Sequence, residues 1–214
     1  QSPSPLGRLH AMYSLDGQCR LSPRESSVET SAAFAERKAT LLARLDDEHP
    51  RVRQHAVRLA EQALDDSPAL WEELFSMVDD QDPLVRYQLA FTLGELPGQK
   101  ATAALAAIAA QDATDRWVRL AVLSSATGRT GELFAHLAAD SRWRTSDGAR
   151  VLLEQLAEQA GLHGRGDQVD KLAKSLERFT AKEKPLLHAV VRGLFRGIDK
   201  LDSPLRQTLV SRRD

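Results

Sequence analysis

The chain has 214 residues, 42% hydrophobic and 28% charged, so it can bury a core and is not a disordered tail. Only 5% of the residues are aromatic, while alanine and leucine are abundant, which favours helix-on-helix packing over β-strands. The formal net charge of −1 excludes a global field that would attract nucleic acid or an anionic membrane.

The N-terminal segment resembles a pattern that recurs later in the chain. Residues 5–15 align with residues 83–93, with Pro5 falling on Pro83, and this predicts a helix. The polar stretch from Gln18 to Ser31, which includes Cys19 and a proline, predicts an extended loop. Because the first repeat contains only its second helix, we expect the chain to be a fragment of a longer polypeptide.

An Asp-containing turn then recurs with a fixed spacing. Three positions keep one constant interval through three copies of the pattern. They are Asp46, Asp79 and Asp112, then Val52, Val85 and Val118, and finally Arg53, Arg86 and Arg119. The pattern predicts three repeats that end near residue 128.

Each copy contains two predicted helices. An apolar helix precedes the Asp turn, and a second helix starts at Pro50 or Pro83, because proline is tolerated in the first turn of a helix. The third copy lacks this proline. Gly94 and Gly128 stand near the ends of their helices, where glycine is typical of a C-terminal cap.

Beyond residue 128 the period weakens, but helical patterns continue. We expect helices near residues 131–140, 147–160, 167–179, 184–198 and 203–212. Residues 129–214 are therefore predicted to be degenerate repeats that cap the array formed by residues 1–128. The predicted fold is all-α, a single continuous solenoid with the form of a right-handed α-α superhelix.

The Asp…Pro-x-Val-Arg-x-x-Ala pattern with its 33-residue period resembles HEAT repeats of the short type, over Pro5 to about Ser125. In that family the turn Asp and the Arg of the second helix form a ladder of polar contacts between repeats. The resemblance implies this structural role for six residues. They are Asp46, Asp79, Asp112, Arg53, Arg86 and Arg119.

A narrower resemblance rests on four segments in one order, residues 9–17, 49–61, 164–167 and 193–197. It is to the helical segment of large exported membrane-bound dehydrogenases of the planctomycete type. Those proteins carry a sugar-dehydrogenase-like β-propeller before the helical repeats and a cytochrome c-like haem domain after them. The resemblance implies a spacer between two such domains, in a periplasmic or membrane-associated parent protein.

The sequence favours a scaffold over an enzyme. We expect this scaffold to contact other proteins or neighbouring domains of the same chain, and not nucleic acid. We expect no catalytic residues, cofactor, metal or membrane insertion. Four candidate interaction residues combine tryptophan and arginine, the composition of binding hot spots: Trp117, Trp143, Arg192 and Arg196. Both tryptophans could instead fill grooves between repeats.

Two alternative functions stay open. A nucleic-acid-binding HEAT protein, similar to the DNA glycosylases of this architecture, would need a concave face rich in Lys and Arg. Residues 1–140 instead hold 14 Lys/Arg against 20 Asp/Glu, and residues 141–214 hold 15 against 10. An enzyme that resembles the HEAT-like chromophore lyases would need a polar, acid-containing pocket in the concave face.

Overall fold

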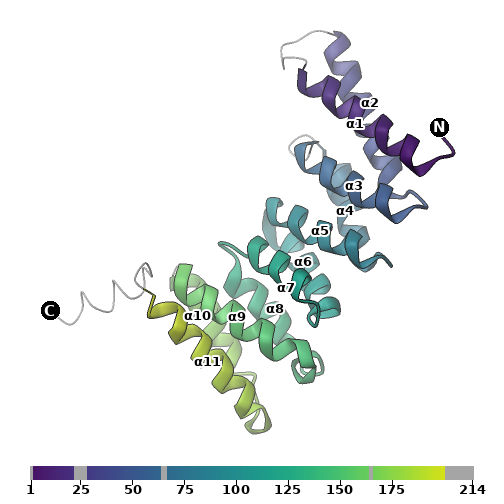
Figure 1. Ribbon diagram of the computed structural model, residues 1–214. Coiled ribbons are helices and arrows are strands. Elements are labelled where there is room, and N and C mark those ends of the chain that lie inside the picture. Colours follow the sequence, from purple (N-terminus) through teal and green to yellow (C-terminus); the bar gives the residue numbers. More distant parts are fainter. Residues whose placement is uncertain (1, 22–27, 64–66, 164–165, 201–214) are drawn as a thin grey trace. The chain divides into compact units, whose positions relative to one another are not determined.

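A computed structural model of the protein describes residues 2–21, 28–63, 67–163 and 166–200 (Figure 1). Over these residues the chain forms α-helices and single 3-10 turns, and it contains no β-strand. This confirms the all-α fold expected from the sequence. The chain divides into two compact units, residues 1–96 and residues 97–214.

The unit of residues 1–96 consists of two layers of helices. Its helices are α1 (Pro5–Leu21), α2 (Val28–Leu45), α3 (Pro50–Ala60), α4 (Pro68–Ser76) and α5 (Pro83–Glu95). The second helices α1, α3 and α5 lie side by side, since α3 contacts both of the others, while α2 contacts α4. Fully buried aliphatic side chains such as Val52, Leu74 and Leu89 fill the space between them.

Short polar residues start the helices of the repeats. His49 and Asp82 stand directly before Pro50 and Pro83. The side chain of each accepts a hydrogen bond from the backbone N–H group two residues later. In the third copy, which lacks the proline, Asp115 accepts from the N–H groups of Trp117 and Val118, at 2.7 and 3.2 Å. Asp115 therefore starts the second helix of the third copy, in which the proline is missing.

The unit of residues 97–214 repeats the two-layer arrangement. Its described helices are α6 (Gly98–Asp112), α7 (Arg116–Ser125), α8 (Thr130–Ala139), α9 (Asp147–His163), α10 (Gly166–Leu176) and α11 (Lys184–Ile198). Helix α8 contacts α6 and α10 in one layer, and α9 contacts α7 and α11 in the other. The helix expected at 203–212 lies outside the described residues.

Three glycines bring α9 and α11 into backbone contact. A Cβ atom at Gly161 would lie 2.3 Å from the carbonyl oxygen of Leu194, and one at Gly193 would lie 2.3 Å from that of Glu154. At Gly197 the distance to the carbonyl oxygen of Glu158 would be only 2.0 Å. Glycine is therefore required because any side chain would push the two helices apart.

Two details of the expected connections differ from the structure. The segment 18–31 was expected to be a loop, but α1 continues to Leu21 and α2 starts at Val28, which leaves only residues 22–27, outside the described residues. Gly94 lies within α5, so it does not follow the end of its helix. Gly128, which follows α7, has a φ of 78°, the left-handed conformation expected of a terminating glycine.

The glycine contact gives a stability prediction. Gly197→Ala should lower the free energy of unfolding by about 1–3 kcal/mol, because the new methyl group collides with backbone atoms that cannot rotate away. Gly17→Ala is the matched control, since Gly17 lies in α1 with no heavy atom within 4 Å of the place its methyl group would take, and alanine favours helix. Urea denaturation of both variants measures the difference, and equal stabilities would contradict the close-contact interpretation.

Candidate functional site

Five arginines near the starts of the second helices make the same hydrogen bond. Each donates through Nη1 to a backbone carbonyl six residues earlier. The pairs are Arg8 with Ser2 (3.3 Å), Arg53 with Asp47 (2.8 Å), Arg86 with Asp80, Arg119 with Ala113 (2.6 Å) and Arg144 with Ala138 (2.5 Å). In the last four pairs the guanidinium group satisfies a carbonyl at or just after the end of a first helix, where a positive charge is favourable.

Two of these arginines also bind a carboxylate of the following repeat in the unit of residues 1–96. Arg8 donates through Nη2 to Oδ1 of Asp47 at 2.8 Å, and its Nε lies 2.8 Å from Oδ2. Arg53 binds both oxygens of Asp80, at 2.7 and 2.8 Å. These side chains are mostly buried, so the paired hydrogen bonds form in surroundings that exclude much of the solvent.

The acidic partners of the ladder differ from the expected ones by one position in the sequence. We expected Asp46, Asp79 and Asp112, but Asp46 and Asp79 are exposed and Asp112 is the last residue of α6. Asp47 and Asp80 take the role instead. One repeat period after Asp80 stands Ala113, so the third copy has no carboxylate at this position.

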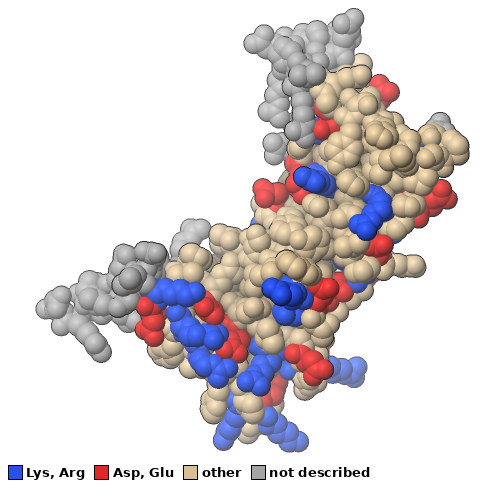
Figure 2. Space-filling view, viewed as in Figure 1, with Lys and Arg blue, Asp and Glu red and all other residues tan. Residues whose placement is uncertain are grey.

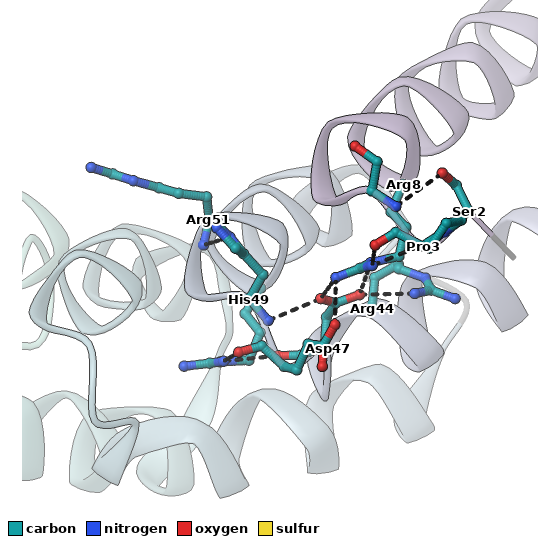
Figure 3. A network of polar contacts seen from close by, with 10 residues as sticks. Ser2, Pro3, Arg8, Arg44, Asp47, His49 and Arg51 are labelled. Carbon is teal, nitrogen blue, oxygen red and sulfur yellow. Dashed lines mark hydrogen bonds and ion pairs between the residues drawn. The ribbon is translucent and has the colours of Figure 1, made fainter.

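The carboxylate of Asp47 collects donors from several segments (Figure 3). Besides Arg8, it accepts from Nη1 of Arg44 at 2.8 Å and from the backbone N–H of His49 at 3.0 Å. Burial alone would raise the pKa of Asp47, but these hydrogen bonds outweigh it and lower the pKa below its usual value. The pKa of Asp80 is lowered in the same way, against burial, by Arg53 and the N–H of Asp82.

Arg144 forms a similar pair in the unit of residues 97–214. It donates from Nε to Oε1 of Glu183 at 2.6 Å and from Nη2 to Oε2 at 3.2 Å, and it lies 4.9 Å from the ring centroid of Phe179. Its hydrogen bond lowers the pKa of Glu183 to about 2, assisted by bonds from Thr180. Sequence analysis missed Arg144 because it follows Arg119 at a shorter interval than the repeat period.

The structure separates the two candidate tryptophans. Trp117 is 59% exposed on α7, and the guanidinium group of Arg116 lies 5.0 Å from its ring centroid. Trp143 is only 9% exposed, and its Nε1 donates to the carbonyl of Ala110 at 3.0 Å. Trp143 therefore packs between helices, as the groove-filling alternative expected, and it is too buried to contact a partner. Trp117 is exposed, so the groove-filling alternative is wrong for it.

The two candidate arginines of α11 are paired within their own unit. Arg192 binds both oxygens of Glu154 at 3.1 and 3.0 Å, and Arg196 binds Glu154 at 2.8 Å and Glu158 at 3.1 Å. Figure 2 shows acidic and basic side chains next to one another over α9 and α11. Because they are half exposed and screened by solvent, the pairs add little stability.

Aromatic pairs lie on the second helices of the unit of residues 1–96, and sequence analysis did not identify them. The Tyr13 hydroxyl lies 2.7 Å from Nδ1 of His55, with the rings edge to face. Tyr87 and Phe91 form another edge-to-face pair, with centroids 5.2 Å apart. Burial, then Arg58 and Arg51, lower the pKa of His55, which favours the neutral ring.

The described residues contain no group of three or more His, Cys, Asp or Glu side chains that could hold a metal ion. None of the described helices is long and apolar enough to span a membrane. Cys19 is buried, and its Sγ lies 3.6 Å from the carbonyl of Ala33.

The ladder predicts a stability loss on mutation. Arg53→Ala should lower the free energy of unfolding by about 1–3 kcal/mol, because the carboxylate of Asp80 and the carbonyl of Asp47 lose the hydrogen bonds that Arg53 donates. Arg51→Ala is the control, since Arg51 is exposed and its guanidinium group binds only the side chain of Gln54 among the contacts described. If thermal melting places both variants at the wild-type temperature, the ladder does not stabilise the fold.

The Arg144–Glu183 pair predicts a pH dependence. The pKa of Glu183 is about 2 in the folded chain and near 4.5 in the unfolded one, so the unfolded state binds more protons in between. The pair therefore stabilises the fold fully above about pH 5, and this contribution is lost as the pH falls towards 2. Wild type should be more stable than Glu183→Gln at neutral pH, and urea titrations should show the gap narrowing in acid.

The exposed Glu177 supplies the control for this titration, and Glu177→Gln should follow the wild-type pH profile. A stability gap between wild type and Glu183→Gln that does not change with pH would contradict the assigned shift.

Comparison with known families bears on the repeats described above. Residues 39–126 match the family model of HEAT repeats. Neither the curated proteins nor the solved structures give a match. The matched segment includes α3, α4, α5, α6 and α7 in full, together with the turns that hold Asp47, Asp80 and Asp115. Residues 39–126 are therefore similar to HEAT repeats, and the chain has an all-α fold of the α-α solenoid class.

Proposed function

We propose that the chain is a non-catalytic scaffold that docks other proteins or neighbouring domains through its second helices. The observation that carries this proposal is the exposure of large apolar side chains at equivalent repeat positions. Leu84 and Trp117 stand one repeat period apart, and Leu6 aligns with Leu84; all three are exposed at the start of a second helix. The equivalent position of α3 holds the exposed Arg51, but apolar exposure at the other three positions serves contact with a partner better than it serves the fold.

The carboxylates with lowered pKa values support a structural role. Asp47, Asp80 and Glu183 are bound to Arg8, Arg53 and Arg144, so these carboxylates are held in the connections between helices. A general acid or base needs to reach a substrate with an oxygen or nitrogen that is not already bound. Pairing of this kind supports a scaffold over a catalyst.

The narrower resemblance supports a more specific proposal. We infer that the chain is a spacer between a dehydrogenase-like β-propeller and a cytochrome c-like domain within a larger exported protein. The coding sequence that surrounds the chain tests this: propeller repeats upstream and a CxxCH haem motif downstream are expected. If the flanking sequence contains neither motif, the spacer proposal is wrong and the scaffold proposal stands.

Photo-crosslinking tests the scaffold itself. A photoreactive p-benzoylphenylalanine that replaces Tyr87 of the second helix α5 should form a covalent adduct with a protein in the organism that makes this chain. The same group at the exposed Ala69 of the first helix α4 is the control and should give none. Denaturing gels and mass spectrometry identify the adducts; no adduct at Tyr87, or equal adducts at both positions, would refute docking through the second helices.

A further inference from the structure

Two positions recur on one side of the three second helices in the unit of residues 1–96. One is the second residue of each helix, and the other lies seven residues later, which places both on the same face of the helix. The residues at these positions are Leu6 and Tyr13 of α1, Arg51 and Arg58 of α3, and Leu84 and Phe91 of α5. We refer to these six residues as the three-helix face.

The three-helix face is turned away from the core. Five of its six side chains are exposed, among them Leu6 at 62% and Tyr13 at 41%, and Phe91 is half-buried. The other sides of α3 and α5 supply buried residues such as Val52 and Leu89. Single exposed apolar residues are ordinary, but several on neighbouring helices of one layer indicate a binding surface.

A side-chain contact joins the α1 part of this face to the α3 part. The Tyr13 hydroxyl lies 2.7 Å from Nδ1 of His55, and the two rings meet edge to face. His55 comes four residues after Arg51 and three before Arg58, so the three side chains are neighbours on α3. Tyr13 therefore borders the two arginines through His55.

A second contact joins the α3 part to the α5 part. Glu61, which comes three residues after Arg58, accepts a hydrogen bond from Nε2 of Gln88 at 3.1 Å. Gln88 lies four residues after Leu84 and three before Phe91, so it is the neighbour of both on α5. The arginines of α3 therefore lie between an apolar surface on α1 and another on α5.

Arg51 and Arg58 keep their charge available to a partner. Arg51 donates to the neutral amide of Gln54, and within the described residues no carboxylate binds either arginine. Figure 3 shows the Arg51 side chain extending away from the network of polar contacts beside it. Two nearby carboxylates already have donors of their own, since Glu61 accepts from α5 and Asp82 caps that helix.

The spacing of the helices matches an extended chain that crosses them. The axes of packed helices lie about 8–10 Å apart, so the apolar surfaces of α1 and α5 are about 16–20 Å apart, with the arginines midway. An extended chain rises about 3.3 Å per residue, and every second side chain points to the same side. Six steps of such a chain span the three helices, and the side chains at its second and fourth steps reach α3.

We propose that the three-helix face binds an extended peptide segment with an apolar side chain at each end and two carboxylates between them. The apolar side chains contact α1 and α5, and the carboxylates pair with Arg51 and Arg58. This inference rests on the proposed scaffold function and specifies the chemistry of the partner. Nucleic acid fits less well, because residues 1–96 hold 10 Lys/Arg against 16 Asp/Glu, and this net charge of −6 repels a polyanion.

Fluorescence anisotropy of labelled peptides, titrated with the whole chain, tests the proposal. The probe has a seven-residue core with leucine at both ends, glutamate at the third and fifth positions, and serine elsewhere. One control peptide exchanges the leucines with the glutamates, which keeps composition and charge, and another has lysine for glutamate. The probe should bind at least about fivefold more tightly than either control, with an affinity that falls as salt rises.

Charge variants locate the binding site. Arg51→Glu/Arg58→Glu should weaken binding of the probe about tenfold or more, whereas Arg51→Lys/Arg58→Lys, which keeps both charges, should stay within about threefold of wild type. Lys174→Glu/Lys182→Glu reverses two exposed charges in the other unit and is the control for net charge. It should change the affinity less than about twofold, because salt screens distant charges.

The apolar contacts have a variant and a control of their own. Leu84→Ser should weaken binding of the probe about fivefold or more, because one leucine of the peptide loses its contact. Val151→Ser removes an exposed apolar side chain from the other unit and should leave the affinity unchanged. Thermal melting should show unchanged folding in all variants, since the mutated side chains are exposed.

Three results would overturn the proposal: no binding of the probe, equal affinity for either control peptide, or undiminished binding by Arg51→Glu/Arg58→Glu. A duplex oligonucleotide that binds more tightly than the probe, and loses affinity in the same variant, would overturn it in favour of nucleic acid. In each case a protein adduct at Tyr87 in the crosslinking experiment would still support the scaffold, and only the assigned chemistry of the partner would be wrong.

Discussion

The double use of Arg8 and Arg53 links neighbouring repeats within residues 1–96, because each binds a backbone carbonyl and also a carboxylate of the following repeat. Arg53 illustrates it, since the same guanidinium group binds the carbonyl of Asp47 in its own repeat and the carboxylate of Asp80 in the next. The first bond fixes the angle between two helices, and the second fixes the distance between repeats. The apolar contacts between helices are not directional, so these polar bonds supply the register.

The period of the sequence predicted the helices well because turn chemistry repeats with it. It could not decide between Asp46 and Asp47, since both have an aspartate counterpart one period later, and only the direction of the side chain separates the exposed residue from the buried one. The two tryptophans posed the same difficulty. Trp143 lies in a turn, and its indole N–H donates to the carbonyl of Ala110. Trp117 lies instead on the solvent-facing side of a helix.

The candidate binding surface was less accessible to sequence reasoning than the fold. Trp117 could be identified from its composition and its arginine neighbour, but its exposure could not be predicted from the sequence. Gln159 of α9 contacts Leu123 of α7 at an interval longer than the repeat period, and the repeat motif is absent from α9. Packing sets this register through Gly148, where the absence of a side chain lets two backbones meet.

The contact of α9 with α11 has a mechanical consequence. Where carbonyl oxygens of one helix face glycine Cα atoms of the other, neither helix can slide or rotate without a collision of backbone atoms, and no rotamer change relieves it. The pair therefore moves as one stiff rod. Arrays of helical repeats bend by small rotations between successive repeats, so in residues 97–214 such bending has to come from helix pairs separated by deformable side chains.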